Sequence, residues 1–353
     1  MTDLCWQCQR NNTLIMRSAN TPDASKDERI INQKNHLQRV NEEREMYREM
    51  VKVSKETIGD EELRPHAPCS TDVKAHYSFD YAQQVHFPSN PLQPGPMYFL
   101  TPRKCGIFGI CSEGQPQQIN YLIDEGMCIN KGSNAVISYL DHFFTHYGMG
   151  EKEVFLHCDN CSGQNKNRFV MQYYAWRVIT GQHQDVSLNF MISGHTKFAP
   201  DWCFGLCKQS FRRTHVSCLD DISKAFINST PETGTNQVQL VGTEDGQVFV
   251  EQRNWQVFLS DFFRANAMEG MKQWHHFRFT SSEPGVVYVK RLLSDPEIRI
   301  SMLKKGVSVT DVRIERPVPI RPPGLPLVRQ QYLHSSIREF CKEGTEDTVC
   351  PQP

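Results

Sequence analysis

Hydrophobic and polar positions in the first part of the chain repeat with the period of a helix. Residues 25–58 contain neither Gly nor Pro, and apolar side chains recur there at steps of three or four residues or their multiples. The apolar positions are Ile31, Leu37, Val40, Tyr47, Met50 and Val53. This spacing predicts an amphipathic helix. Such a helix either packs on its own domain or forms a homodimer through a short coiled coil. Residues 59–75, which are polar and contain prolines, predict a linker.

The middle of the chain alternates between strand and helix patterns. We expect strands at 76–87, 104–114, 117–126, 153–159 and 186–193, and helices at 133–148, 164–179 and 201–213. Three antiparallel strands followed by alternating helices and strands predict an α/β fold, a mixed sheet with helices on its faces. This order of elements resembles that of ribonuclease H-like domains.

Residues 230–353 have a different pattern. Short strands are predicted at 237–243, 247–252 and 285–293, one helix at 254–265 and an extended arm at 316–326. We therefore expect three parts, a Cys-x-x-Cys segment with the charged helix (1–70), a ribonuclease H-like core (71–229) and a small α+β, strand-rich C-terminal module (230–353).

Composition limits the class of protein. Of 353 residues, 39% are hydrophobic and 22% charged, and the net charge is -1, which argues against an acidic tail or a strongly basic coat but allows a local basic face. No apolar run reaches the roughly 18–20 residues that span a bilayer, so we expect no membrane partner. The 13 cysteines are an odd number and follow no secretory signal, which predicts an intracellular, reducing compartment. We expect the nucleus rather than the cytoplasm.

Three aspartates lie where a ribonuclease H-like fold holds its metal ligands. Asp80 is in an apolar and aromatic strand, Asp159 follows the fourth strand, and Asp201 begins a helix after Pro200. The resemblance implies that these carboxylates bind two Mg²⁺ or Mn²⁺ ions for phosphodiester chemistry. Each has a simpler interpretation as well, since Asp80 can face solvent, Asp159 can start an Asx-turn and Asp201 can cap a helix. Asp124 and Glu125 are the substitutes if one assignment fails.

The polar residues around the second and third aspartates are candidate substrate ligands. These are Asn160, Gln164, Asn165, Lys166, Arg168, His195 and Lys197. Amides beside a metal site and basic groups at a helix N-terminus suit phosphate. The alternatives are helix capping and a solvated helix face, and for His195 a bound metal, a bound water or a role in ordering its loop.

The sequence also resembles a more specific family. The run DNCSGQNKNR (159–168), followed by GHTKFAPDWCFG (194–205), is similar to the signature of a family of transposon-derived animal proteins. CWQCQ (5–9), the helix at 25–58 and WHHFRFTSSEPGVV (274–287) match its other segments. The resemblance implies a transposase-type core of the DDE/DDD kind that cleaves or joins DNA. Because no separate helix-turn-helix or complete zinc finger precedes the core, a domesticated protein that binds nucleic acid or protein without catalysis is the alternative.

Cysteine pairs are weaker signals. Cys5 and Cys8 are candidate Zn²⁺ ligands, but the sequence does not show which residues would complete their site. Cys158 and Cys161 form a second C-x-x-C around Asp159, and a buried thiol at a strand end is the preferred interpretation.

Overall fold

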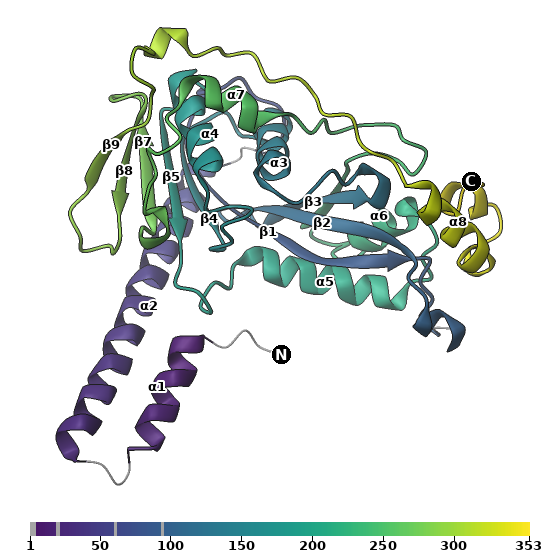
Figure 1. Ribbon diagram of the computed structural model, residues 1–353, viewed down its shortest axis with the longest axis horizontal. Helices are drawn as coiled ribbons and strands as arrows, with labels where there is room; N and C mark the ends of the chain where they lie inside the picture. Colours follow the sequence, from purple (N-terminus) through teal and green to yellow (C-terminus); the bar gives the residue numbers. More distant parts are fainter. Residues whose placement is uncertain (1–4, 19–21, 60–61, 93–94) are drawn as a thin grey trace.

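One mixed sheet of nine strands organises the computed structural model, so the predicted α/β class is confirmed (Figure 1). The structure describes residues 5–18, 22–59, 62–92 and 95–353. Across the sheet the strands lie in the order β6-β3-β2-β1-β4-β5-β7-β8-β9. Their bounds are β1 Thr71–Phe87, β2 Arg103–Ser112, β3 Gln117–Asp124, β4 Glu151–Cys158, β5 Asp185–Phe190, β6 Asn236–Leu240, β7 His276–Thr280, β8 Val286–Lys290 and β9 Ile298–Ser301.

Two kinds of strand pairing meet at β1. On one side β1 pairs antiparallel with β2, and β2 pairs antiparallel with β3. On the other side β1 pairs parallel with β4, and β4 pairs parallel with β5. Parallel strands need a crossover, and the helices between β3 and β4 and between β4 and β5 provide it. The parallel strands therefore all end at the same edge of the sheet.

Helices cover both faces of this sheet. The helices among the described residues are α1 Trp6–Met16, α2 Asp23–Ile58, α3 Ser133–His146, α4 Arg168–Ile179, α5 Ala199–Arg213, α6 Leu219–Ile227, α7 Trp255–Phe262, α8 Leu327–Ser336 and α9 Glu346–Val349. Tyr77 and Phe79 of β1 are buried in a large apolar cluster with residues of α3, α4 and α7. Alternate positions pack on the other face, where Ile107 of β2 joins Phe204 of α5 in a second cluster. No helix among the described residues is long and apolar enough to cross a membrane.

The second half of α2 lies against the sheet. His276 Nε2 of β7 is 2.9 Å from Glu43 Oε1. The ring of Tyr47 lies edge-on to His76 and His157, which are themselves joined by a 2.8 Å hydrogen bond between β1 and β4. This half of the predicted helix therefore packs on its own protein, whereas the first half projects from the sheet beside α1 (Figure 1).

The strands of residues 230–353 extend the same sheet at both edges. β6 pairs parallel with β3, and β7 to β9 continue from β5. The strand predicted at 247–252 is wrong, since only an isolated bridge between Gly242 and Val248 forms there. Residues 316–326 contain no helix or strand and run over the outside of the molecule to α8 (Figure 1). The domain boundary at residue 230 stays a prediction.

Close packing of α5 on β2 generates the first testable prediction. A Cβ at Gly109 would lie 2.6 Å from the ring of Phe204, so Gly109→Val must push α5 off the sheet. We expect it to lower the free energy of unfolding by roughly 1–3 kcal/mol in denaturant titrations. Gly205→Ala on the same helix is the control, because a Cβ there meets nothing within 4 Å. A Gly109→Val protein that unfolds at the wild-type midpoint would contradict this packing.

Candidate functional site

Asp80 and Asp159 come together because their strands are parallel neighbours. Phe79 of β1 is opposite Cys158 of β4, and the next residue of each chain segment is an aspartate. Asp80 is partly buried, and burial, followed by the charge of Asp159, raises the pKa of its carboxyl to about 7. The charge of Asp201 makes a smaller contribution to the same rise. The interpretation of Asp80 as a strand aspartate that simply faces solvent is therefore wrong.

A tight turn holds the carboxylate of Asp159. Its Oδ1 accepts hydrogen bonds from Asn165 Nδ2 at 2.6 Å and from the amide N of Cys161 at 3.1 Å. The amides of residues 164–166 all donate to the carbonyl of Cys161, so the chain turns here before the helix begins. Asn167 then caps α4, which starts at Arg168 and not at Gln164 as predicted. Asp159 therefore starts an Asx-turn, as one interpretation of the sequence predicted. The hydrogen bonds of this turn also fix the direction of its carboxylate.

Asp201 is the third residue of α5, and its side chain bonds back to the helix start. Asp201 Oδ2 accepts from the amide N of Phe198 at 3.0 Å. The amide N of Ala199 donates to the buried Glu113 at the end of β2, which ties this helix start to the sheet. Asp201 is exposed, and its charge acts on the carboxyl of Asp80.

The candidate phosphate ligands are divided between the interior and the surface. Lys166 is 4% exposed, donates to Asn160 Oδ1 at 3.0 Å and lies over the ring of Phe190, and burial lowers its pKa to about 8. Asn160 in turn donates to the carbonyl of Met191. Both side chains therefore tie the turn after β4 to the end of β5.

The remaining candidates lie nearer the surface. Arg168 donates to the carbonyl of Ala265 at 3.3 Å, and Gln164 is partly exposed. Lys197 is exposed on the loop that leads to Asp201. Phosphate binding by the whole set stays a prediction, and Lys197 is the exposed cation of the set.

The two substitute acids have other partners. Asp124 forms a buried, two-point ion pair with Arg103, at 2.7 Å for both bonds. Glu125 pairs with Arg329 of α8 at 2.8 Å. These carboxylates fix β3 and α8 in place, so Asp80, Asp159 and Asp201 stay the candidate acidic site.

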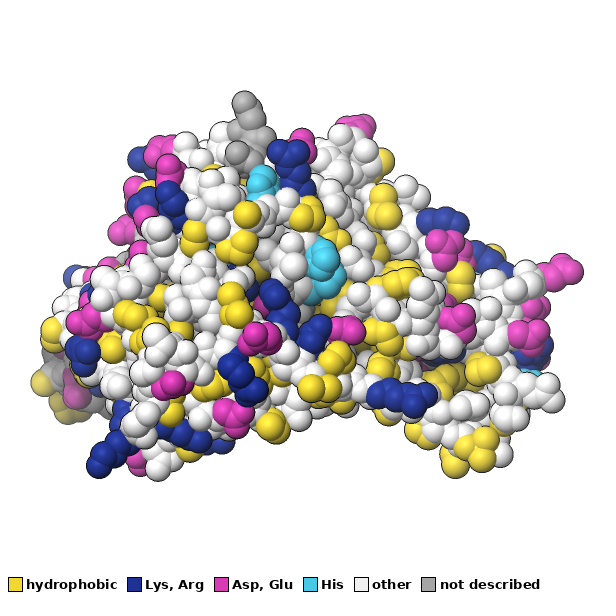
Figure 2. Space-filling model, turned by 90° about the horizontal axis from the view of Figure 1, so that it is seen from above, with side chains coloured by type: hydrophobic (Ala, Val, Ile, Leu, Met, Phe, Trp, Pro, Cys, Tyr) yellow, Lys and Arg dark blue, Asp and Glu magenta, His cyan; other side chains and the backbone are white. Residues whose placement is uncertain are grey.

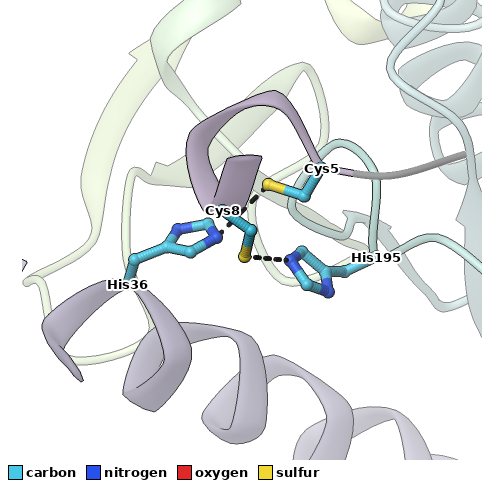
Figure 3. Close-up of side chains that lie close together, drawn as sticks. All are labelled: Cys5, Cys8, His36 and His195. Atoms are coloured by element: carbon cyan, nitrogen blue, oxygen red, sulfur yellow. Dashed lines mark hydrogen bonds between the residues drawn. The ribbon is translucent and has the colours of Figure 1, made fainter. Parts of the chain in front are cut away.

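A second constellation joins Cys5 and Cys8 to two histidines (Figure 3). Cys5 Sγ is 3.3 Å from His36 Nε2, and Cys8 Sγ is 3.5 Å from His195 Nε2. One ligand atom from each of the four residues lies within 4.8 Å of all the others. Among the residues that the structure describes, no other group of three or more Cys, His, Asp or Glu residues has its ligand atoms this close together. The carboxylates of the three aspartates are therefore too far apart to bind one ion in this way.

His36 is the functional candidate that the sequence did not reveal. It projects from α2, and it meets Cys5 only because α1 folds back along that helix. Burial, and then the neighbouring His195, lower the pKa of His36, and burial lowers the pKa of His195 as well, so both imidazoles are held neutral. Cys158, by contrast, is fully buried in the apolar cluster and belongs to no such group, as a strand-end thiol should.

Comparison with known proteins identifies a family but not an activity. Residues 100–294, more than half of the chain, match the family described as Domain of unknown function (DUF7869), and the chain belongs to this family. The match covers Asp159, His195 and Asp201 and begins after Asp80. Neither a curated protein nor a solved structure matches the chain.

The cost of burying Asp80 beside Asp159 gives a pH-dependent prediction. The pKa of Asp80 rises from an ordinary 3.8 to about 7 in the fold, so the folded protein holds this proton more tightly than the unfolded chain. The stabilisation that the proton provides is present below about pH 4 and is lost as the pH rises through 7. We expect Asp80→Asn to raise the free energy of unfolding at pH 8, in chelator, by roughly 1–4 kcal/mol, because it removes a buried charge. The gain should shrink at pH 4, where the folded carboxyl is protonated.

Chemical denaturation at the two pH values measures this gain. Asp27→Asn, which removes an exposed carboxylate from α2, is the matched control and should change neither value. An equal effect of Asp80→Asn at pH 4 and pH 8 would contradict the charge repulsion inferred here.

Proposed function

We propose that this member of the DUF7869 family has a transposase-derived, ribonuclease H-like core that cleaves or joins DNA phosphodiesters with Mg²⁺ or Mn²⁺. The observation that carries the proposal is the convergence of Asp80, Asp159 and Asp201 from β1, the end of β4 and the start of α5. The charges of Asp159 and Asp201 both act on Asp80, and Asp80 and Asp159 are partly buried, so this arrangement is costly for a fold unless it serves a ligand.

The arrangement of strands supports the ribonuclease H-like assignment. The five central strands lie in the order β3-β2-β1-β4-β5, with the first three antiparallel and the last two parallel to β1. Ribonuclease H-like domains have this order, and they place their acids on the first strand, after the fourth strand and on the helix after the fifth. Asp80 on β1, Asp159 after β4 and Asp201 on α5 support this assignment.

The chemistry of the donors fits hard divalent cations. Carboxylate oxygens are the ligands that Mg²⁺ and Mn²⁺ prefer. Asn165 Oδ1 is buried next to Asp159 and has no hydrogen-bond partner among the described residues, so it offers an acceptor to a water of a hydrated cation. Two cations held by the aspartates would activate the attacking oxygen and stabilise the leaving oxygen.

Other residues of the chain orient the carboxylates and contact the nucleic acid. Asn165 fixes the rotamer of Asp159, and the amide N of Phe198 fixes that of Asp201. Lys197 offers an exposed positive charge to a phosphate. Trp202 follows Asp201, is 57% exposed, and offers an aromatic face on which an unpaired base can stack.

On the face seen from above in Figure 1, the described residues form no extended basic track (Figure 2). Figure 2 shows basic and acidic side chains interspersed on the face seen from above in Figure 1. We expect DNA to approach the α5 side of the sheet, where Lys197, Asp201 and Trp202 are exposed, and we propose the nucleus as the location of a protein with this substrate. Homodimer formation would use the projecting half of α2, where Ile30, Ile31 and Leu37 are exposed.

A domesticated binding protein without turnover is the second candidate. The observation that favours it is that Asp159 and Asp201 each accept hydrogen bonds from their own loop, so both would be retained for folding alone. It predicts salt-dependent DNA binding, or protein binding, without cleavage.

Substitution of Asp159 separates the two candidates. We expect the wild-type protein to cleave or join DNA with Mg²⁺ or Mn²⁺, and Asp159→Asn to lower the rate by at least about 100-fold, since an amide is a poor metal ligand. Asp27→Asn should keep the full rate. Wild-type protein without turnover on single-stranded, duplex or branched DNA would leave only the binding function, and turnover that survives Asp159→Asn would refute the site.

Trp202 tests the approach of DNA to α5. Trp202→Ala should weaken binding of single-stranded DNA by roughly 5- to 150-fold in fluorescence anisotropy, because one stacked base is worth about 1–3 kcal/mol. Phe249→Ala is the control, since Phe249 is 43% exposed and lies beside Ser138 of α3 on the opposite face. Equal affinities of the two variants would rule out a base contact at Trp202.

A further inference from the structure

The four residues Cys5, Cys8, His36 and His195 come from three separate segments of the chain (Figure 3). Cys5 and Cys8 lie at the start of α1, His36 on α2, and His195 in the loop between β5 and α5. We propose that they bind one structural Zn²⁺ ion, which joins the α1–α2 hairpin to the loop that carries Asp201 into the acidic site. This proposal rests on the cluster alone and does not require catalysis.

Distances between the ligand atoms fit a shared tetrahedral ion. With Zn–S of about 2.3 Å and Zn–N of about 2.0–2.1 Å, a sulfur and a nitrogen on one zinc lie roughly 3.5–3.6 Å apart. The two observed S···N distances are 3.3 and 3.5 Å. Two thiolates and two imidazoles complete the four-coordinate shell of a structural site and leave no open position for a substrate.

The backbone around the cluster is shaped to bring these segments together. Gly194 has φ of +80°, and a Cβ at this position would lie 2.4 Å from Cys5 Cα. Only glycine therefore allows the loop before His195 to approach the start of α1 so closely.

Side chains of α2 support the same loop. Arg44 donates to the carbonyl oxygens of His195 at 2.6 Å and Lys197 at 2.7 Å, which fixes the loop on both sides of Thr196. Gln33 Nε2 lies 3.6 Å from Cys8 Sγ and can donate to the thiolate. Outer contacts of this kind commonly orient metal ligands.

The α1–α2 hairpin has almost no apolar core of its own. No residue of α1 is buried, and among the described side chains of residues 22–42 only His36 is buried. Trp6, Met16 and Ile31 are more than half exposed. Small units that bury so little commonly depend on a metal or a disulfide, and zinc binding then supplies folding free energy.

The ion would also fix the approach to α5. His195 precedes Asp201 by six residues, and Lys197 lies between them. Binding of His195 would hold this loop at both ends, through the zinc and through Phe198 at the helix start. A chain without zinc should therefore loosen both the hairpin and this loop while the sheet persists.

Metal content of the purified full-length chain tests the proposal. We expect about one zinc per chain by mass spectrometry of the metal, and less than a tenth of that in the double variant Cys5→Ser and Cys8→Ser. The double variant Cys69→Ser and Cys128→Ser removes two other partly exposed thiols and should retain the metal. Replacement of zinc by Co²⁺ should give the visible absorption of a tetrahedral thiolate site.

Histidine variants keep the test decisive if the cysteine variant fails to fold. His36→Ala should lose zinc, whereas His36→Cys, which restores a ligand, should retain it. Hydrogen exchange should show faster exchange in residues 5–58 and 191–198 after zinc removal, with β1 and β4 still protected. Absence of zinc together with no cobalt spectrum on reconstitution, or full zinc binding by His36→Ala, would overturn the proposal whether or not the protein cleaves DNA.

Discussion

The parallel pairing of β1 with β4 sets the geometry on which the candidate site depends. It places Asp80 and Asp159 on neighbouring strands at the same level of the sheet, and burial together with the second charge raises the pKa of Asp80 to about 7. A one-residue shift of either strand would turn its aspartate to the other face, into the aromatic cluster under α3 and α4. Tyr77, Phe79 and Tyr81 alternate along β1 and pack on the core side of the sheet, which fixes this register. The packing that builds the core therefore also positions Asp80.

The position of Asp201 depends on the contacts that hold α5 on the sheet. Phe204 sits over Gly109 of β2 and anchors α5, while Glu113 holds the amide of Ala199 at the helix start. The loop ahead of this helix is held by Arg44 of α2 and lies next to Cys5. This loop therefore connects the N-terminal helices to the helix that carries Asp201, so two chemically different clusters occur at one end of β5.

Local sequence patterns predicted the strands and helices of the core, because apolar residues recur at the spacing of the buried face of each strand or helix. Strands β1 to β5 and helices α2, α3 and α5 lie within a few residues of their predicted bounds, apart from the earlier start of β1 at Thr71. The start of α4 was placed too early, because Asn167 competes for the helix amides and the residues before it form a turn. Residues 247–252 have strand composition but form only one isolated bridge, between Val248 and Gly242.

Long-range contacts determine what the sequence could not show. Asp80 and Asp159 are recognisable from their positions in apolar segments, whereas the inward orientation of Lys166 depends on Phe190 and Asn160 in three dimensions. His36 resembles any polar residue of a charged helix until α1 folds back against it. Cys5 and Cys8 indicated a ligand pair, but 31 and 187 residues separate them from their histidine neighbours.

Anomalous diffraction from crystals grown with Mn²⁺ tests the central claim most directly. Carboxylates that evolved for two-metal chemistry should give manganese peaks roughly 3.5–4 Å apart between Asp80, Asp159 and Asp201. The account predicts these peaks in the wild-type protein. Crystals in which the three carboxylates bind no manganese at millimolar concentration, and contact only their own loops, would contradict it.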